Sequence, residues 1–192
     1  MEWGEQLVGQ MEFYWDVHLR PRLDGLTDDE YAWQPVPDCF DLAPTDDGRL
    51  RYVESPASAV TVTTLRWRLM HIAIGCFRTR ASTFFGDGSV PDDADMFDER
   101  HLPDSVPGDA TGAIEFLDRS YAWWHDALVV IDDDAMARPL GPKGAFFADD
   151  PMAALVLHVN RELMHHGGEV GLLRDLYRAR PGGVAAPDDL SS

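Results

Sequence analysis

Hydrophobic residues recur every three to four positions in four segments of the chain, which is the spacing expected of helices that bury one face. The segments cover about residues 3–23, 57–85, 111–130 and 150–178. Proline, glycine or aspartate clusters bound each of them, and Asp150 and Pro151 offer an N-cap and a first-turn proline for the last helix. The pattern therefore predicts an all-α fold, a four-helix bundle.

Two of the connections between these segments are long. Residues 27–54 contain a short helical turn capped by Thr27, followed by a polar stretch, and residues 90–109 contain three prolines. Because both exceed the length of ordinary bundle loops, they predict crossover connections and an up-down-down-up order of helices. One domain over residues 1–180 accounts for all four helices. Residues 181–192 are rich in Pro, Gly, Ala, Asp and Ser, which predicts a flexible tail.

Composition excludes several classes of partner. At 192 residues and 45% hydrophobic content the chain can bury one sizeable core. A formal net charge of −18 predicts that it binds neither nucleic acid nor an anionic membrane. Cys39 and Cys76 are too few for a disulfide framework. No stretch reaches about 20 apolar residues, and the N-terminus is acidic, so we expect a cytoplasmic protein.

The last predicted helix concentrates the residues with metal-binding chemistry. Its apolar face is defined by Leu155, Val159, Leu163, Val170 and Leu173. At about 100° per residue, Glu162 and His166 project into that face, whereas His158, His165 and Glu169 lie along its edge. A carboxylate buried without a partner is costly, and a metal ion shared with the imidazole one turn away removes that cost. The alternative is that Glu162 and His166 pair with each other or with an arginine from another helix.

A third ligand comes from the second predicted helix. His71 lies in its middle, between Met70 and Ile72. A lone histidine in such a setting is more often a core residue than a ligand. With Glu162 and His166, however, it completes a His₂Glu set, the pattern that leaves a fourth position open for water or substrate.

Other catalytic motifs are missing from the sequence. There is no His-Glu-x-x-His zinc motif, no Gly-x-Ser-x-Gly elbow and no P-loop. Glu162-x-x-His165 matches half of a di-iron bundle, but no second Glu-x-x-His exists. The tryptophans, including Trp67, Trp123 and Trp124, stand at helical spacing, which favours the core over a binding pocket. A mononuclear metal site remains.

Several short motifs, in this order and spacing, carry a family resemblance. They are Leu26–Trp33, Trp67–Ile72, Phe84-Phe85-Gly86, Glu162–Glu169 and Leu172–Tyr177. The sequence resembles the DinB-like superfamily, metal-binding four-helix proteins that include thiol S-transferases and the mycothiol-dependent maleylpyruvate isomerase. The family commonly uses three histidines. The resemblance places the first at His71 and the third at His166, while Glu162 stands where the middle histidine is expected, as in the isomerase branch.

The resemblance implies a divalent metal ion held by His71, Glu162 and His166. Zn²⁺ is the first expectation, and Ni²⁺, Mn²⁺ and Fe²⁺ are compatible with a carboxylate ligand. It also implies a reaction in which a low-molecular-weight thiol or a water is activated to attack a small-molecule substrate, and a homodimer. Glu169 is a candidate to orient a ligand or relay a proton. His158 and His165 are candidates to hydrogen-bond the metal ligands from outside the metal's own coordination shell. The alternatives are a non-catalytic metal-binding domain and an interaction bundle without metal.

Overall fold

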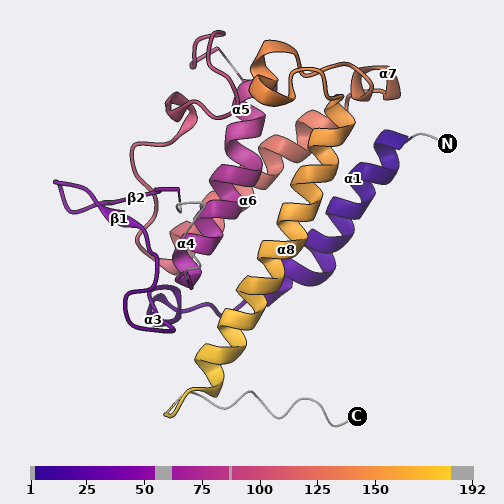
Figure 1. Cartoon of the computed structure of the whole chain (residues 1–192). Coiled ribbons are helices and arrows are strands. Elements are labelled where there is room, and N and C mark those ends of the chain that lie inside the picture. Colours follow the sequence, from indigo (N-terminus) through magenta and orange to yellow (C-terminus); the bar gives the residue numbers. More distant parts are fainter. Residues whose placement is uncertain (1–2, 55–61, 87, 183–192) are drawn as a thin grey trace, which may run out of the picture.

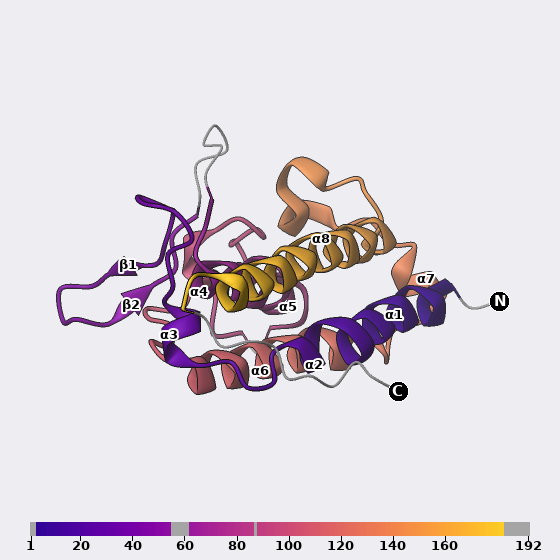
Figure 2. The same ribbon diagram turned by 90° about the horizontal axis from the view of Figure 1, so that it is seen from below.

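The computed structural model describes residues 3–54, 62–86 and 88–182, and these are mostly helical. Four helical rods pack side by side (Figures 1 and 2). The rods are α1 (Trp3–Tyr14) with η1 (Trp15–Leu19) and α2 (Arg20–Arg22); α4 (Leu65–Met70) with η2 (His71–Arg78) and α5 (Thr79–Phe85); α6 (Ala110–Leu128); and α8 (Met152–Ala179). The segments η1 and η2 are π-helical turns inside otherwise α-helical rods. The predicted all-α bundle of four helices is confirmed.

The rods are joined by long crossovers. Asp28, in the short helix α3 (Asp28–Tyr31), accepts a hydrogen bond of 2.8 Å from the backbone N–H of Ala110, where α6 begins. At the other end of the bundle Asp133, in α7 (Asp133–Met136), accepts one of 2.8 Å from Gly4. The first and last rods therefore run in one direction and the two middle rods in the other (Figure 1). This is the predicted order of directions.

The first crossover contains a small hairpin that the sequence did not reveal. Strands β1 (Ala43–Pro44) and β2 (Leu50–Arg51) pair antiparallel around a turn at Gly48, whose φ is +81°. Strands of two residues are too short to show an alternating pattern, which explains why they were missed. Short 3₁₀ helices, η3 (Glu99–His101) and η4 (Gly141–Phe147), lie in the later connections.

The second rod begins later than the predicted residue 57. The side chain of Thr64 accepts a hydrogen bond of 3.2 Å from the N–H of Trp67 and caps α4, so the helix begins at Leu65. Thr63 instead forms a parallel bridge with Phe40. The prediction was therefore wrong for residues 62–64, and the part of it that covers residues 57–61 lies outside the described residues.

The start of α8 is also shifted. Pro151 is the N-cap, with extended backbone (φ −73°, ψ 156°), and the helix begins at Met152. The carbonyl of Asp150 accepts a hydrogen bond of 2.9 Å from Leu140, which keeps Asp150 in the preceding loop. The prediction of Asp150 as N-cap was wrong by one position. In the predicted tail, residues 183–192 lie outside the described residues.

The far end of α8 is fixed by a buried ion pair. Arg174 and Glu30 are 1% and 3% exposed, and their side chains form two hydrogen bonds, of 2.7 and 3.0 Å. Arg174 also donates to the backbone carbonyls of Arg22 and Asp24. The pair therefore ties α8 to α3 and to the end of the first rod.

Tryptophans contribute to the core as expected. Trp67 and Trp124 are buried, and Trp123 packs partly buried against the core with its ring 5.3 Å from the guanidinium carbon of Arg78. Among the described residues, no helix is both long enough and apolar enough to span a bilayer.

Candidate metal centre

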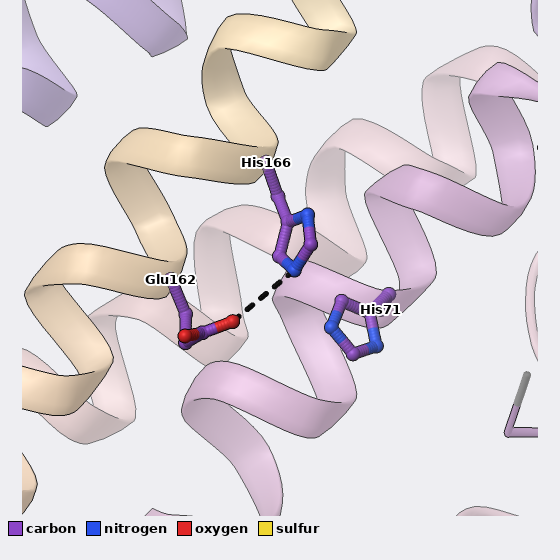
Figure 3. A group of neighbouring side chains, drawn as sticks. All are labelled: His71, Glu162 and His166. Carbon is purple, nitrogen blue, oxygen red and sulfur yellow. Dashed lines mark ion pairs between the residues drawn. The ribbon is translucent and has the colours of Figure 1, made fainter. Parts of the chain in front are cut away.

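Three side chains from two rods converge between η2 and α8 (Figure 3). His71 is the first residue of η2, and Glu162 and His166 stand one turn apart on α8. One ligand atom from each of the three lies within 4.8 Å of the others. Glu162 Oε2 is 3.3 Å from His166 Nε2, and the rings of His71 and His166 meet at 87° with centroids 4.6 Å apart. The structure thus brings together the three residues selected from the sequence, in a group that could hold a metal ion.

The ring of His71 is held from two sides. Its Nδ1 lies 2.8 Å from the hydroxyl of Tyr52, and Trp67 stacks on it with centroids 5.0 Å apart and planes at 10°. Trp67 is itself fixed, because its Nε1 donates a hydrogen bond of 2.8 Å to the carbonyl of Val53. Burial, with the nearby His166 and Arg68, lowers the pKa of His71 to about 3. His71 is therefore neutral, and its Nε2 is left to face the other two side chains (Figure 3).

The absence of a side chain at Gly75 makes room for this ring. A Cβ atom at Gly75 would lie 3.3 Å from both Cε1 and Nδ1 of His71. Gly75 belongs to the π-helical turn η2, and such turns are frequent at functional sites. The backbone of η2 can therefore approach the imidazole closely without displacing it.

His166 is oriented through its other nitrogen. Nδ1 lies 2.7 Å from Glu169 Oε2, and the guanidinium of Arg68 forms an ion pair of 2.9 Å with the same carboxylate oxygen. Burial alone would raise the pKa of Glu169, but the hydrogen bond to His166 and the charge of Arg68 hold it below its ordinary value. Two tautomers fit these contacts. With the proton on Nδ1, His166 donates to the Glu169 carboxylate and its Nε2 lone pair faces Glu162; with the proton on Nε2, Nδ1 accepts from Nη1 of Arg68, 3.0 Å away, and Nε2 donates to Glu162. A metal ion on Nε2 requires the first tautomer.

Arg68 also bears on the alternative in which an arginine pairs with Glu162. Arg68 does come from another rod, but it contacts Glu169 and lies 3.0 Å from Nδ1 of His166. The arginine near Glu162 is Arg161, its own neighbour on α8, at 3.4 Å. Both parts of the alternative thus have a counterpart in the structure, because Glu162 lies 3.3 Å from Nε2 of His166 and Arg68 contacts His166 from another helix. Among the described residues, no arginine from another helix forms an ion pair with Glu162 itself.

A cavity of about 180 Å³ adjoins two of the three residues, His71 and Glu162. It is lined by Glu54, His71, Gly75, Cys76, Arg80, His158, Val159 and Glu162. Burial, together with the charge of Glu162, raises the pKa of Cys76 to about 12, so this thiol stays protonated. Cys76 does not belong to the group of side chains close enough to share a metal ion, and a protonated thiol is a poor nucleophile.

The donor set fits a divalent transition metal. Two imidazoles, each with its second nitrogen engaged, and one carboxylate match the ligands that Zn²⁺ and its neighbours accept. The engaged nitrogens are Nδ1 of His71, at Tyr52, and Nδ1 of His166, at Glu169. The adjoining cavity leaves room for a further small ligand.

The other histidines of α8 lie at the edge of the site, as their helical phase predicts. His158 lines the cavity, and its Nδ1 lies 2.5 Å from Nη2 of Arg161. His165 lies 3.5 Å from Glu169 and is 64% exposed at its side chain. His165, His166 and Glu169 form a second group close enough for a metal. That group comes from one helix alone and shares His166 with the first group.

Of the residues that support the ligands, Glu169 was named from the sequence as a candidate to orient a ligand, whereas Arg68, Gly75 and Tyr52 were missed. Arg68 stands one turn before His71 and carried a signal, because residues i and i+3 share a helix face. Gly75, one turn after His71, carried the same signal. Tyr52 comes from an irregular loop, and nothing in its local sequence points to the site.

The comparisons with known proteins assign the family. No match was found among curated proteins or among solved structures. A model of the DinB superfamily matches residues 16–170 of the 192, a range that includes His71, Glu162 and His166. The chain therefore belongs to the DinB superfamily.

Proposed function

We propose that the protein is a metal-dependent enzyme that binds one divalent ion through His71, Glu162 and His166 and acts on a small molecule. The observation that carries the proposal is that each of the two histidines is held by a contact to its second ring nitrogen. Each imidazole has its Nδ1 engaged, by Tyr52 or by Glu169, and presents Nε2 toward the Glu162 carboxylate. Such outer hydrogen bonds fix the tautomer and orientation of metal-ligating histidines.

The chemistry that a divalent ion supplies with three protein ligands is to lower the pKa of a water or thiol held at the open position. The thiol has to come from a small molecule, because Cys76 is buried with its pKa raised to about 12. Thiol transfer and thiol-dependent isomerisation are therefore the reaction classes we favour, with hydrolysis by water as the simpler variant. Zn²⁺ is the metal we propose first, since two imidazoles and a carboxylate are a common catalytic zinc set.

The side chains of the protein would position the reactants. Arg68 keeps Glu169 ionised, and Glu169 holds His166 by its Nδ1 proton. The imidazole of His158 lines the cavity next to Glu162 and is partly exposed, so it can pass a proton between cavity and solvent. Val159 and Cys76 close the apolar side of the cavity and limit the entry of water.

A non-catalytic metal site is the second candidate. The cavity is small, at about 180 Å³, and the three ligands join η2 to α8, so an ion here would also hold the two rods together. The two functions differ in the fourth ligand. A water or an exchangeable thiol in that place supports the enzyme, whereas a fourth protein ligand supports the structural site.

The first experiment measures metal content. Wild-type protein, His71→Ala, Glu162→Ala and His166→Ala are loaded with Zn²⁺, desalted and analysed by mass spectrometry, with His165→Ala as the matched control. We expect near-stoichiometric metal in the wild type and the control, and strong loss in the other three. Equal near-zero occupancy in all five proteins would overturn the proposal, and loss in His165→Ala but not in His71→Ala would move the site to the second histidine group.

The second experiment addresses the reaction. Glutathione, mycothiol and bacillithiol are tested for binding to the zinc-loaded protein and for conjugation to an electrophile. We expect one of them to bind and to react faster than with the metal-free protein. If none binds, and spectroscopy of a Co²⁺-substituted protein shows a closed shell of protein ligands, the structural site is the better description.

A further inference from the structure

Arg80 lines three cavities that adjoin one another beside the candidate metal centre. The first, which we call the metal cavity, is the cavity of about 180 Å³ lined by His71 and Glu162. The second, which we call the apolar cavity, has about 380 Å³ and is lined by Met96, Phe97, Leu140, Phe147 and Leu155, among others. The third also has about 380 Å³ and is lined by Tyr52, Glu54 and Thr79, among others. One charged side chain therefore stands where a molecule next to the metal would extend away from it.

The guanidinium of Arg80 is held in place but not neutralised. Its Nη1 donates a hydrogen bond of 2.5 Å to the carbonyl of Met96, and its central carbon lies 5.2 Å from the centroid of the Phe97 ring. Its Nε is buried and has no hydrogen-bond partner. Within the part of the chain that the structure describes, no carboxylate forms an ion pair with it, in contrast to Arg68, which pairs with Glu169.

The guanidinium of Arg80 can therefore still bind an anion, because its Nε has no hydrogen-bond partner. Burial lowers the pKa of Arg80, yet arginine remains charged at neutral pH. A buried donor without a partner is costly, and a ligand that supplies an acceptor recovers that cost. The carboxylate of Glu54 lines two of the cavities without ion-pair contact to Arg80, and Glu162 lines the metal cavity. Asp150 lines the apolar cavity, and Asp98 and Glu99 line the third cavity. These negative charges disfavour a doubly charged phosphate more than a singly charged carboxylate.

We propose that Arg80 binds the carboxylate of a small substrate whose hydrocarbon body occupies the apolar cavity and whose reacting atom faces His71, Glu162 and His166. His158 and Arg80 line both the metal cavity and the apolar cavity, so the two spaces adjoin at these residues. The planar fork of a guanidinium matches a carboxylate, and each such charge-assisted contact adds orientation as well as affinity. This inference rests on the proposed function, because it names the substrate class of the same site.

The alternative is that Arg80 serves only to hold the loop at Met96 against α5. The test therefore compares ligands as well as variants. Phenylacetate and its neutral isostere phenylacetamide are titrated into metal-free protein and followed by NMR, so that neither can bind through a metal ion. We expect the wild type to prefer the carboxylate by about tenfold or more, the range of a charge-assisted hydrogen bond.

Three variants separate the outcomes. Arg80→Met is expected to bring the preference for phenylacetate close to one, while Arg80→Lys retains a part of it. Arg161→Met is the matched control, because Arg161 also lines the apolar cavity but its side chain is 69% exposed; it should keep the preference. Circular dichroism and zinc content verify that each variant is folded and that its metal site is intact.

The results distinguish this proposal from the one on which it rests. A wild type without preference for phenylacetate, or a preference that Arg80→Met retains, overturns the role of Arg80 even if zinc binds as expected. Loss of preference in Arg161→Met but not in Arg80→Met overturns it as well. A preference that depends on Arg80 in a protein that binds no zinc would support the carboxylate site and contradict the metal-dependent function.

Discussion

The hydroxyl of Tyr52 lies 2.8 Å from Nδ1 of His71 and joins a loop of the first crossover to the candidate metal centre. For Nε2 of His71 to bind a metal, Nδ1 has to carry the proton and donate it to this oxygen. Tyr52 can accept it in its neutral form, because burial raises the pKa of the phenol. The loop thus selects the tautomer of a ligand that belongs to another element.

Removal of this hydroxyl should weaken the metal site without unfolding the protein. In Tyr52→Phe the Nδ1 proton loses its acceptor, and we expect zinc affinity to fall about 10- to 100-fold, as for other outer-sphere partners of ligating histidines. Competition with a chelating dye measures the change. Tyr31→Phe is the control, since its buried hydroxyl donates to the carbonyl of Pro107, away from the site. Equal affinity of Tyr52→Phe and wild type would show that the tyrosine does not position His71.

Glu169 should have a comparable role at the other histidine. Glu169→Gln keeps the size of the side chain but removes the charge that holds the Nδ1 proton of His166 and pairs with Arg68. We expect zinc affinity to fall by about 10- to 100-fold. Asp175→Asn, on the same helix and in an exposed ion pair with Arg22, is the matched control and should leave affinity unchanged. A variant that binds zinc like the wild type would remove Glu169 from the site.

Replacement of Gly75 by alanine should weaken zinc binding without lowering the stability of the fold. Alanine is favoured over glycine in a helix by about 1 kcal/mol, but the new methyl group would press on His71, which Tyr52 and Trp67 hold in place. We therefore expect Gly75→Ala to fold stably and to bind zinc more weakly. Gly168→Ala is the control on α8, because no atom lies within 4 Å of its added Cβ. Weaker zinc binding in both variants would refute the steric explanation.

Some of these residues could be predicted from the sequence to lie at the site, and others could not. Glu162 and His166 could be selected because the apolar positions of one uninterrupted helix define its buried face, and a polar residue on that face needs a reason. Tyr52 could not, since its approach to His71 depends on how a loop crosses the bundle. Arg80 lies beyond the π-helical turn η2, which changes the phase of the rod relative to a regular α-helix. A helical wheel drawn from the sequence therefore does not place it at the cavity.

The starts of two helices likewise could not be predicted from local sequence. Thr64 and Pro151 determine where α4 and α8 begin, but both positions are set by pairings with distant residues: Thr64 pairs with Phe40, and Pro151 forms a bridge with Pro139. The periodic interior of each rod was readable because it depends on local spacing. The first turns of α4 and α8 were not, because they depend on contacts across the chain, whereas α6 begins within one residue of its predicted start.

The buried pair of Arg174 and Glu30 should dominate the stability of one end of the bundle. Arg174→Met leaves the Glu30 carboxylate buried without its partner, so we expect the free energy of unfolding to fall by about 3–5 kcal/mol. Urea titration at neutral pH measures it. Arg119→Met is the control, because its ion pair with Glu115 is exposed, and its effect should remain within about 0.5 kcal/mol. If the double variant Glu30→Met, Arg174→Met is no more stable than Arg174→Met alone, the loss does not come from the unpaired charge.

Two histidines, His101 and His125, should change the stability of the protein in opposite directions as pH falls. His101 should make the folded protein less stable at acid pH. It is buried between Ser82 and Thr83, and burial lowers its pKa. As pH falls below about 6.5, the ordinary pKa of histidine, the unfolded chain takes up a proton that the folded protein resists. The stability difference between wild type and His101→Gln should therefore shrink as pH falls from 7.5 to 5, measured by urea unfolding at each pH.

His125 is the counterpart with the opposite sign. Burial alone would lower its pKa, but hydrogen bonds to Glu12 and Asp126 raise it above the ordinary value. The stabilisation by these carboxylates is complete below the pKa of the unfolded state and disappears as pH rises through that of the folded state. The difference between wild type and His125→Gln should therefore grow as pH falls over the same interval. Because the two histidines titrate over neighbouring ranges in the same protein, a shared artefact of acid pH would move both differences in one direction, whereas burial and ion pairing require them to diverge.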